Sequence, residues 1–541
     1  MAAIETPCKQ QRGRADEKPA WAPVAQLQTG LYYLKLCPTG LRLVRRLRRF
    51  LVLGLSLVSV VTLGACALSR YDAQPVSVEQ AERQFLARTA QHEGVRSFLA
   101  ANGVDVRAWP LARWSLRELT LLAFYYHPDL DVARAYWDSV RLTGPAWDSV
   151  RAEGIPSAAG GLTGVNPALA HHSRRSDNGE RVSPWTLSIA FDYAFTGARK
   201  RDAQLAYARA QARAAQWEIA KTAWRVRSVL RERALTYHAA LQRAQSWRAE
   251  QELRAALLQS LEKRLKAGAA SQLDLSAARG AASEVAARLD QARSEAAAAR
   301  VGLGQALGLS AQKLDKLALD FAQFSAVPGA EQVPAAGVQR AALWHRGDIQ
   351  QALSAYEAED KRLQVELSKQ YPDFSISPGF SWDQEDNVWQ LGWNIGLPLP
   401  KSNVAAIAQV RAQRVLQAQR LRALQAKVIG DLEQAQVNYE GARQAIGRAE
   451  QLIEERRAHV ERMEKQLGAG YANRLDVTLA RLELAGAQRQ HVEALIAAQI
   501  ALGLLEDVVQ RPLAGAPLPP VPKRNPREAN ATGGQMTQAK P

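Results

Sequence analysis

Few residues in this chain have the types and spacing that chemistry requires, and the clearest group of them occurs twice. In both copies an aspartate follows a glycine by six positions and precedes an arginine by five: Gly268, Asp274 and Arg279, then Gly470, Asp476 and Arg481. An aspartate at the start of a helix can accept hydrogen bonds from free backbone N–H groups. The pattern therefore predicts two glycine-containing turns, each followed by a helix whose first turn the aspartate caps.

Other reactive side chains lack partners at a useful spacing. The sequence contains no nucleophile elbow, no phosphate-binding loop and no metal-ligand spacing. His171 and His172 are adjacent without further ligands, so we expect them to be solvated. Three cysteines provide no disulfide framework. We therefore predict no enzymatic activity, no catalytic residue, no cofactor and no metal site.

The net charge of +17 comes partly from the N-terminus. Residues 1–65 contain ten Lys/Arg and three Asp/Glu, which leaves +10 for the rest of the chain. Nucleic-acid binding requires basic residues clustered beside aromatic residues or in a groove-binding motif. The arginines here are scattered along alanine-rich stretches, where we expect a solvated helix face. We therefore expect no nucleic-acid partner.

The N-terminus has the features of an export signal. A cluster of arginines precedes a fourteen-residue apolar run, Phe50 to Leu63, which is followed by Cys66. Basic, apolar and small residues in this order define a secretory signal, and the run is shorter than the ~20 residues of a membrane-spanning helix. Leu63-Gly64-Ala65-Cys66 resembles the lipobox of bacterial lipoproteins, which predicts lipid attachment at Cys66. A plain signal peptide with an incidental cysteine is the alternative.

The two halves of the chain repeat each other at a separation of about 200 residues. Beyond the glycine turns, three matches keep the same order: Asp129-Leu130 with Asp348-Ile349, Trp185 with Trp389, and Arg209 with Arg411. Matching residues in matching order indicate one structural unit used twice.

Each unit begins with a strand pattern. Large apolar residues alternate with small or polar ones over 187–195, 374–382 and 391–399, which is the period of a strand with one apolar face. The first copy's partner strand is expected near 155–165, and residues 171–181 are expected to form an exposed loop. Strands of about nine residues with one apolar face suit a membrane barrel.

Two long helices follow each strand pattern. Helical spacing runs over 199–266 and 404–467, and helices over 272–309 and 474–509 return after the glycine turns. The first helix would extend on the order of 100 Å at ~1.5 Å per residue. Alanine at many seam positions allows antiparallel helices to approach closely, as in a coiled coil. A soluble coiled coil would explain the helices but not the alternating segments.

The glycine turns, strand hairpins and twofold repeat resemble the TolC-type outer membrane efflux family over roughly residues 114–511. The resemblance implies a mainly α protein with a membrane β-barrel portion, built from two tandem repeats of a strand hairpin and long antiparallel coiled-coil helices. In that family three protomers form one α/β duct with a twelve-stranded barrel. It implies a homotrimer, lipid-anchored in the outer membrane and spanning the periplasm, whose partners are a periplasmic adaptor protein and an inner-membrane pump.

The resemblance also assigns roles by position. Gly268 and Gly470 fall at the turns that contact the adaptor. Asp476 falls at the constriction of the periplasmic gate, and Asp274 is its counterpart in the first repeat. Three copies of one carboxylate around a narrow axis would attract cations. Leu479 stands where some members of the family carry a second aspartate, which puts a double acidic ring in doubt.

The remaining expectations are less specific. Arg279 and Arg481 could pair with carboxylates at the closed gate, but we expect them to face neighbouring chains or solvent. Residues 196–201 are similar to a Gly-x-Arg signature of cation-efflux members. Heavy-metal cations and drugs both stay open as substrates, with protein secretion as a further alternative. The alternative function is a periplasmic adaptor or structural coiled-coil lipoprotein, which usually has one helical hairpin flanked by soluble β-domains.

These expectations divide the chain into six segments. They are the N-terminal extension and lipoprotein signal peptide (1–65), an N-terminal periplasmic segment (66–114), the first repeat (115–310), a linker (311–342), the second repeat (343–510) and a disordered Pro-rich tail (511–541).

Overall fold

The computed structural model of this chain describes residues 75, 77–142, 160–171, 185–195, 197–329, 344–383, 386–396 and 403–513. The expected signal segment with Cys66, the expected loop beyond His171 and the tail from residue 514 lie outside the described residues. The chain divides into two compact units, Met1–Ser77 and Val78–Pro541, and every element below belongs to the second.

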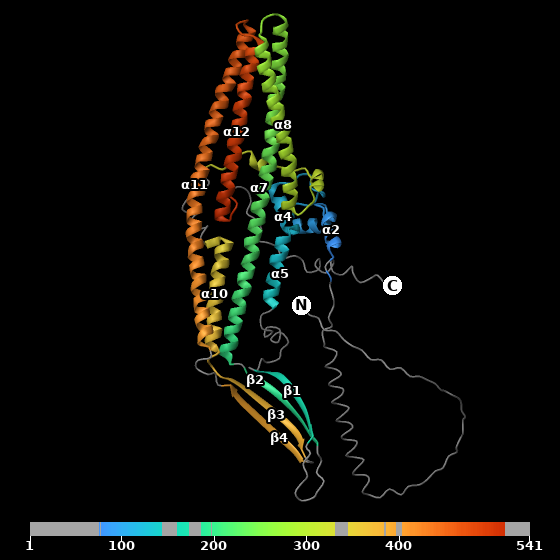
Figure 1. The fold of residues 1–541 in the computed structure, drawn as a ribbon, viewed down its shortest axis with the longest axis vertical. Helices are drawn as coiled ribbons and strands as arrows, with labels where there is room; N and C mark the ends of the chain where they lie inside the picture. Colours follow the sequence, from blue (N-terminus) through green and yellow to red (C-terminus); the bar gives the residue numbers. More distant parts are fainter. Residues whose placement is uncertain are drawn as a thin grey trace, which may run out of the picture. The chain divides into compact units, whose positions relative to one another are not determined.

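Two long helical hairpins form most of this second unit (Figure 1). The first contains α7 (Ala198–Lys266, 69 residues) and α8 (Gln272–Leu307, 36 residues). The second contains α11 (Val404–Gly468, 65 residues) and α12 (Arg474–Val509, 36 residues). All four lie within two residues of the expected bounds, because unbroken runs of Ala, Leu, Gln and Arg favour helix until a glycine turn ends it.

The returning helices cover only part of the long ones, and shorter helices pack against the remainder. Helix α5 (Pro128–Leu142) packs on α7, while α10 (Gly347–Ser368) packs on both α7 and α11. Each of these two helices precedes a strand hairpin and has the matched Asp129 or Asp348 as its second residue. The repeated unit is therefore a short helix, a strand hairpin, a long helix and a returning helix.

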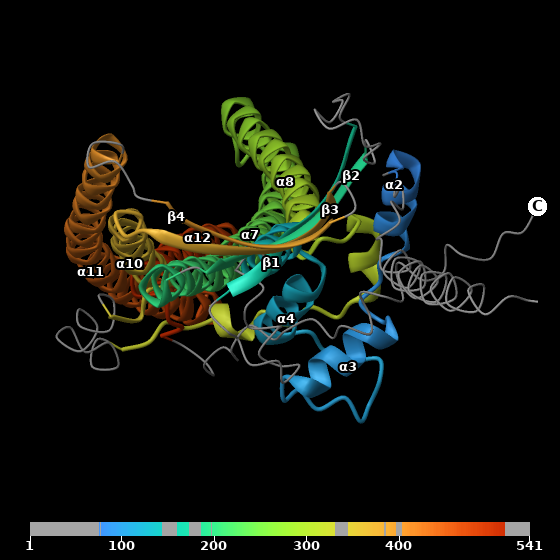
Figure 2. The ribbon, with the colours of Figure 1, turned by 90° about the horizontal axis from the view of Figure 1, so that it is seen from below.

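The four strands form one antiparallel sheet in chain order, and the sheet curves when seen end-on (Figure 2). The strands are β1 (Gly160–His171), β2 (Trp185–Phe195), β3 (Asp373–Asp383) and β4 (Asp386–Gly396). Pairing of β2 with β3 joins the strand hairpins of the two repeats.

The register gives the sheet one apolar and one polar face. Leu187 lies opposite Trp382 and Ile376 lies opposite Trp393, so the large apolar side chains share a face. On this face Trp389 and Leu391 are 81% and 71% exposed. Because successive side chains alternate, the other face carries small and polar residues such as Ser188, Ser381, Ser375 and Asn394.

The position expected for β1 was wrong by about five residues. β1 continues to His171, which was expected to begin a loop. Its apolar-face residues Val165, Pro167 and Leu169 alternate with Asn166 and alanines, which is a weak strand signal. Proline also cannot donate to a sheet ladder, which weakens the signal further. The strand expected over 391–399 is observed as β4, which ends at Gly396. Residues 397–399 lie outside the described residues.

A side cluster packs where α7 meets the end of α8. It contains α3 (Glu93–Ala101), α4 (Leu116–Tyr126) and the short 3₁₀ turns Ala311–Lys316 and Ala322–Phe324. Helix α2 (Val78–Ala87) precedes α3 and has no buried residue. Trp114, Phe124 and Phe324 are fully buried in the side cluster together with Leu230 and Leu303 of the hairpin. The expected N-terminal segment and the expected linker therefore contribute to one core, and part of the linker is folded.

Among the helices that the structure describes, none is both long and apolar enough to cross a lipid bilayer.

Candidate functional site

The two hairpin turns have the same backbone geometry. Gly268 and Gly470 adopt φ values of +72° and +76°, in the left-handed region. Gly268 N–H donates to the Leu265 carbonyl at 3.0 Å, and the N–H of the next residue donates to the Arg264 carbonyl at 2.8 Å. The corresponding bonds follow Gly470. A side chain would meet nothing within 4 Å at either glycine, so the backbone conformation, not space, favours glycine.

Each returning helix begins with a capping box, as the aspartate pattern predicted. Ser271 Oγ accepts from Asp274 N–H at 3.0 Å, and Asp274 Oδ2 accepts from Ser271 N–H at 3.1 Å. In the second repeat Asn473 Oδ1 accepts from Asp476 N–H at 3.2 Å, and Asp476 Oδ2 accepts from Asn473 N–H at 2.9 Å. Hydrogen bonds from the hydroxyl and backbone N–H of Ser271 hold the pKa of the Asp274 carboxyl below its ordinary value.

Arg279 and Arg481 form their ion pairs with glutamates and not with these aspartates. Arg279 Nη2 lies 3.2 Å from Glu262 Oε1, and Arg481 Nη2 lies 2.7 Å from Glu464 Oε1. Each pair joins the outgoing and returning helices of one hairpin, although both arginines remain more than half exposed. These glutamates were not predicted from the sequence. Glu262 and Glu464 are nevertheless 202 residues apart, the same separation as the matched glycines, aspartates and arginines, and this separation could have identified them.

A groove of about 530 Å³ lies between the two turns. Leu257 and Leu261 of α7 line it together with Leu475 and Leu479 of α12, and Asp274 lies at its edge. Beyond the groove the tips are apolar and open, with Tyr471 88% exposed. The tip region can thus offer an apolar surface bordered by charges to another helix. Among the described residues, no three His, Cys, Asp or Glu side chains are placed to share a metal ion.

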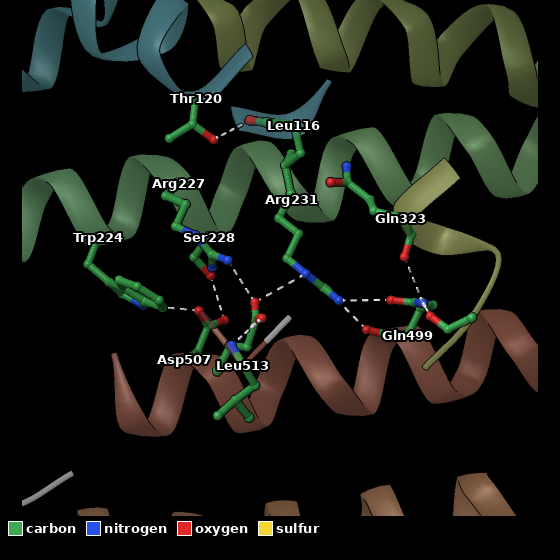
Figure 3. Close-up of polar contacts among 12 residues, drawn as sticks. Leu116, Thr120, Trp224, Arg227, Ser228, Arg231, Gln323, Gln499, Asp507 and Leu513 are labelled. Atoms are coloured by element: carbon green, nitrogen blue, oxygen red, sulfur yellow. Dashed lines mark hydrogen bonds and ion pairs between the residues drawn. The ribbon is translucent and has the colours of Figure 1, made fainter. Parts of the chain in front are cut away.

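The seam between α7 and α12 is polar and buried where the helices run beside the side cluster (Figure 3). Glu506, 2% exposed, accepts from Arg227 Nη2 at 2.9 Å and lies 3.4 Å from Arg231 Nε. Arg231 continues to Gln499, donating to its backbone and side-chain oxygens at 3.0 Å each. The expectation that the arginines lie on solvated faces was wrong for these two, which are 4% and 6% exposed.

Asp507 extends this buried cluster toward the sheet. Its Oδ1 accepts from Trp224 Nε1 at 3.1 Å and its Oδ2 accepts from Ser228 Oγ at 2.5 Å. Burial raises the pKa of the Asp507 carboxyl against the opposing effect of these two donors. Gly503 lies opposite Arg231, and a side chain there would collide with the guanidinium. Glycine at 503 therefore leaves room for the Arg231 guanidinium against α12.

Charged pairs continue along the same seam toward the tips. Arg243 Nε and Nη2 donate to the two carboxylate oxygens of Glu493 at 2.6 and 2.7 Å, and Arg489 pairs with Glu250. The buried positions inside each hairpin are mostly alanine, leucine and valine instead. The buried pairs of Glu506 with Arg227 and Arg231 therefore join the two repeats, whereas the ion pairs Arg279–Glu262 and Arg481–Glu464 within a hairpin are about half exposed.

The comparisons with known proteins agree with this architecture. Residues 338–508 match the family model described as outer membrane efflux protein. The fold is similar to the crystal structure of the outer membrane protein VceC from Vibrio cholerae, with 19% identity and a TM-score of 0.57 over 73% of this chain and 95% of that one. No curated protein sequence matches the chain significantly.

Two further solved structures have the same fold. A membrane protein from Pseudomonas aeruginosa shares 18% identity, with a TM-score of 0.56 over 73% of this chain and 92% of that one. The Campylobacter jejuni CmeC outer membrane channel shares 12% identity, with a TM-score of 0.57 over 73% and 85%. At these identities the structures establish the fold, and the second repeat carries the family match. The chain therefore matches the outer membrane efflux protein model over residues 338–508, and its fold is similar to that of these solved structures.

Proposed function

We propose that three copies of this chain form an outer membrane channel of a tripartite efflux system, which passively conducts substrates from an inner-membrane pump and a periplasmic adaptor to the cell exterior. The observation that carries this proposal is a four-stranded sheet with an exposed apolar face and an opposite polar face. Such a sheet is stable in a bilayer only when its polar face encloses water and its edges are paired.

The edges indicate how the sheet would be completed. Within the described part of the chain, β1 and β4 each pair on one side only. An unpaired strand edge in lipid costs several kcal/mol for each unsatisfied backbone group. Pairing β4 of one copy with β1 of the next satisfies both edges, and three copies give twelve strands. The long helices continue from these strands, so the lumen would continue between them.

The turns are the proposed gate and docking surface. Asp476 from each copy would form a carboxylate ring at the constriction, with Asp274 nearby in the first repeat. Gly268 and Gly470 would present the adjoining groove to helices of the adaptor. Arg279 and Arg481 would stabilise each hairpin through their glutamates rather than bond the gate carboxylates.

The anchor and cargo complete the proposal. A lipid on Cys66 would attach the N-terminus to the outer membrane. Heavy-metal cations and drugs are the proposed cargo classes. Both are kept, because a passive channel takes most of its selectivity from its pump.

The test is to express the full chain in a bacterium with an outer membrane and fractionate the membranes. We expect a heat-modifiable trimer in the outer membrane fraction, an acylated N-terminal peptide by mass spectrometry, and ion conductance in planar bilayers. A salt-extractable monomer without conductance would instead support the alternative, an adaptor or a structural coiled-coil lipoprotein.

A further inference from the structure

The four long helices lie side by side in one row. Helix α7 contacts both α8 and α12, and α12 in turn contacts α11, so the row runs α8, α7, α12, α11 (Figure 1). The middle contact, between α7 of the first repeat and α12 of the second, is called the within-chain seam below. Helices α8 and α11 are the two ends of the row, and each would therefore adjoin a neighbouring copy in a closed ring.

The two repeats match along the full length of these helices at a constant separation. Gln272 and Arg474, the first residues of α8 and α12, are 202 positions apart, and so are Lys266 and Gly468, the last residues of α7 and α11. Every residue of the within-chain seam therefore has a counterpart at one end of the row. A head-to-tail contact closes into a ring when it repeats with the same rotation. We therefore expect α11 of one copy to meet α8 of the next as α7 meets α12.

Positions that are buried in the within-chain seam have exposed counterparts at the ends of the row. Ile429 of α11 corresponds to the buried Arg227, and its side chain is 46% exposed. Val301 of α8 corresponds to the buried Gly503, and its side chain is 49% exposed. The chain itself covers the first set of positions and leaves the second set open. The second set therefore fits a further copy of the same chain.

The chemistry of the two sets differs. The ion pairs of the within-chain seam correspond to uncharged pairs: Arg227–Glu506 to Ile429–Gly304, Arg243–Glu493 to Ala445–Gln291, and Glu250–Arg489 to Leu452–Ala287. Glu433 stands at the position of Arg231, and the counterparts of Gln499 and Glu506 opposite it are Ala297 and Gly304. Large apolar side chains facing alanine and glycine allow two helices to approach closely.

We propose that α11 of one copy binds α8 of the next in the register of the within-chain seam, and that this contact, the copy seam, is apolar where the within-chain seam is ionic. Ile429 and Leu452 of one copy pack on the small residues of α8 in the next. The inference rests on the proposed trimeric channel and identifies the helix faces that join its copies.

The first experiment cross-links the wild-type and variant trimers in isolated outer membranes with a short bismaleimide. Ala445→Cys combined with Gln291→Cys should give linked dimers and trimers on a denaturing gel, because the two positions meet across different copies. The matched control, Arg243→Cys combined with Glu493→Cys, should link only within one chain. Single-cysteine variants correct for reaction of the native cysteines. A heat-modifiable trimer in which the control pair reacts and the pair at 445 and 291 gives no linked dimer overturns the proposal.

A charge-pair exchange keeps the test decisive if the cysteine variants fail to assemble. Ala445→Arg alone should lower the temperature at which the trimer dissociates by several degrees, because its charge would face the uncharged Gln291. Adding Gln291→Glu should restore most of this loss, since the two side chains then repeat the Arg243–Glu493 pair of the within-chain seam. Additive effects of the two substitutions would show that the positions do not meet, and would overturn the proposal.

These results are distinguishable from a failure of the proposed function. A wild-type chain that forms no trimer in the outer membrane contradicts the channel itself, and the copy seam with it. A stable trimer without the cross-link and without the charge-pair rescue contradicts only the copy seam.

Discussion

Asp274 and Asp476 each close the first turn of a returning helix, and both use Oδ2 for the bond to the backbone. A carboxylate can accept with either oxygen, so capping a helix and attracting cations at a constriction are compatible. Removing the side chain would remove both effects at once. Separating them requires a substitution that keeps the acceptor and loses the charge.

The variants Asp476→Asn and Asp476→Ala together separate the capping effect from the charge effect. If the ring controls the gate, both variants should raise single-channel conductance and weaken block by multivalent cations, because both remove three negative charges. If Asp476 acts only as a cap, Asn should behave as wild type and only Ala should differ, with a cost of about 1 kcal/mol to the helix start. Planar-bilayer recordings on purified trimers decide between the two.

The raised pKa of the Asp507 carboxyl predicts that the stability of the fold depends on pH. Its pKa is higher in the folded chain than the ordinary 3.8, so the folded state binds the proton more tightly. Stability contributed by this group therefore increases as pH falls through the folded pKa, and it is lost as pH rises above it.

The measurement is the difference in thermal midpoint between wild type and Asp507→Asn, which cannot titrate at this position. We expect the difference to change in favour of the wild type as the pH is lowered toward 3.8, the ordinary pKa of the carboxyl. Parallel curves over this range would contradict the direction of the shift.

Among the elements, α7 and α12 form a seam in which charge is buried, and removing one partner of a buried ion pair is expected to cost about 3–5 kcal/mol. The seam also depends on a residue without a side chain. Gly503 allows Arg231 to reach across α12, whereas Gly486 of the same helix has open space around it. These two glycines provide a matched pair.

Gly503→Ala should lower the stability by about 1–3 kcal/mol, because the new methyl group displaces a buried guanidinium. Gly486→Ala should raise it by about 0.5–1 kcal/mol, because alanine restricts the unfolded chain and suits a helix interior. Thermal unfolding followed by the helical circular dichroism signal checks both. Equal effects at the two positions would show that Arg231 can reorient at no cost.

The elements also show how far the sequence was predictive. Alternation identified β2 and most of β3 and β4, and helical spacing with glycine turns located the four long helices within two residues. β1 was misplaced because Pro167 and its alanines weaken the alternation. Arg227 and Arg231 were assigned to a solvated face because their partner Glu506 lies 279 residues away from the first of them, and no local period reveals such a pairing.

At the scale of the whole molecule, the sheet sets what the chain can assemble into. Adjacent residues of β4 face opposite environments: Leu391 belongs to the exposed apolar face and Gln390 to the polar face. The same substitution at the two positions therefore reports which face meets lipid.

Leu391→Lys should prevent stable insertion, because a lysine facing lipid at the midplane costs about 2–4 kcal/mol in each copy. Gln390→Lys should be tolerated, since its side chain would lie in the water-filled lumen. The yield of heat-modifiable trimer in membrane fractions measures both. Comparable loss of trimer for the two variants would contradict the assignment of the faces.

The buried cluster around Glu506 has a mechanical consequence for the tips. About 30 residues of α12 separate it from Asp476, a lever arm of roughly 45 Å at ~1.5 Å per residue. A tilt of about 5° around this cluster would carry the far end of the second hairpin by about 4 Å, more than the width of a water molecule. A small tilt about this firmly bonded cluster would thus be enough to widen the proposed gate, which lies far from it.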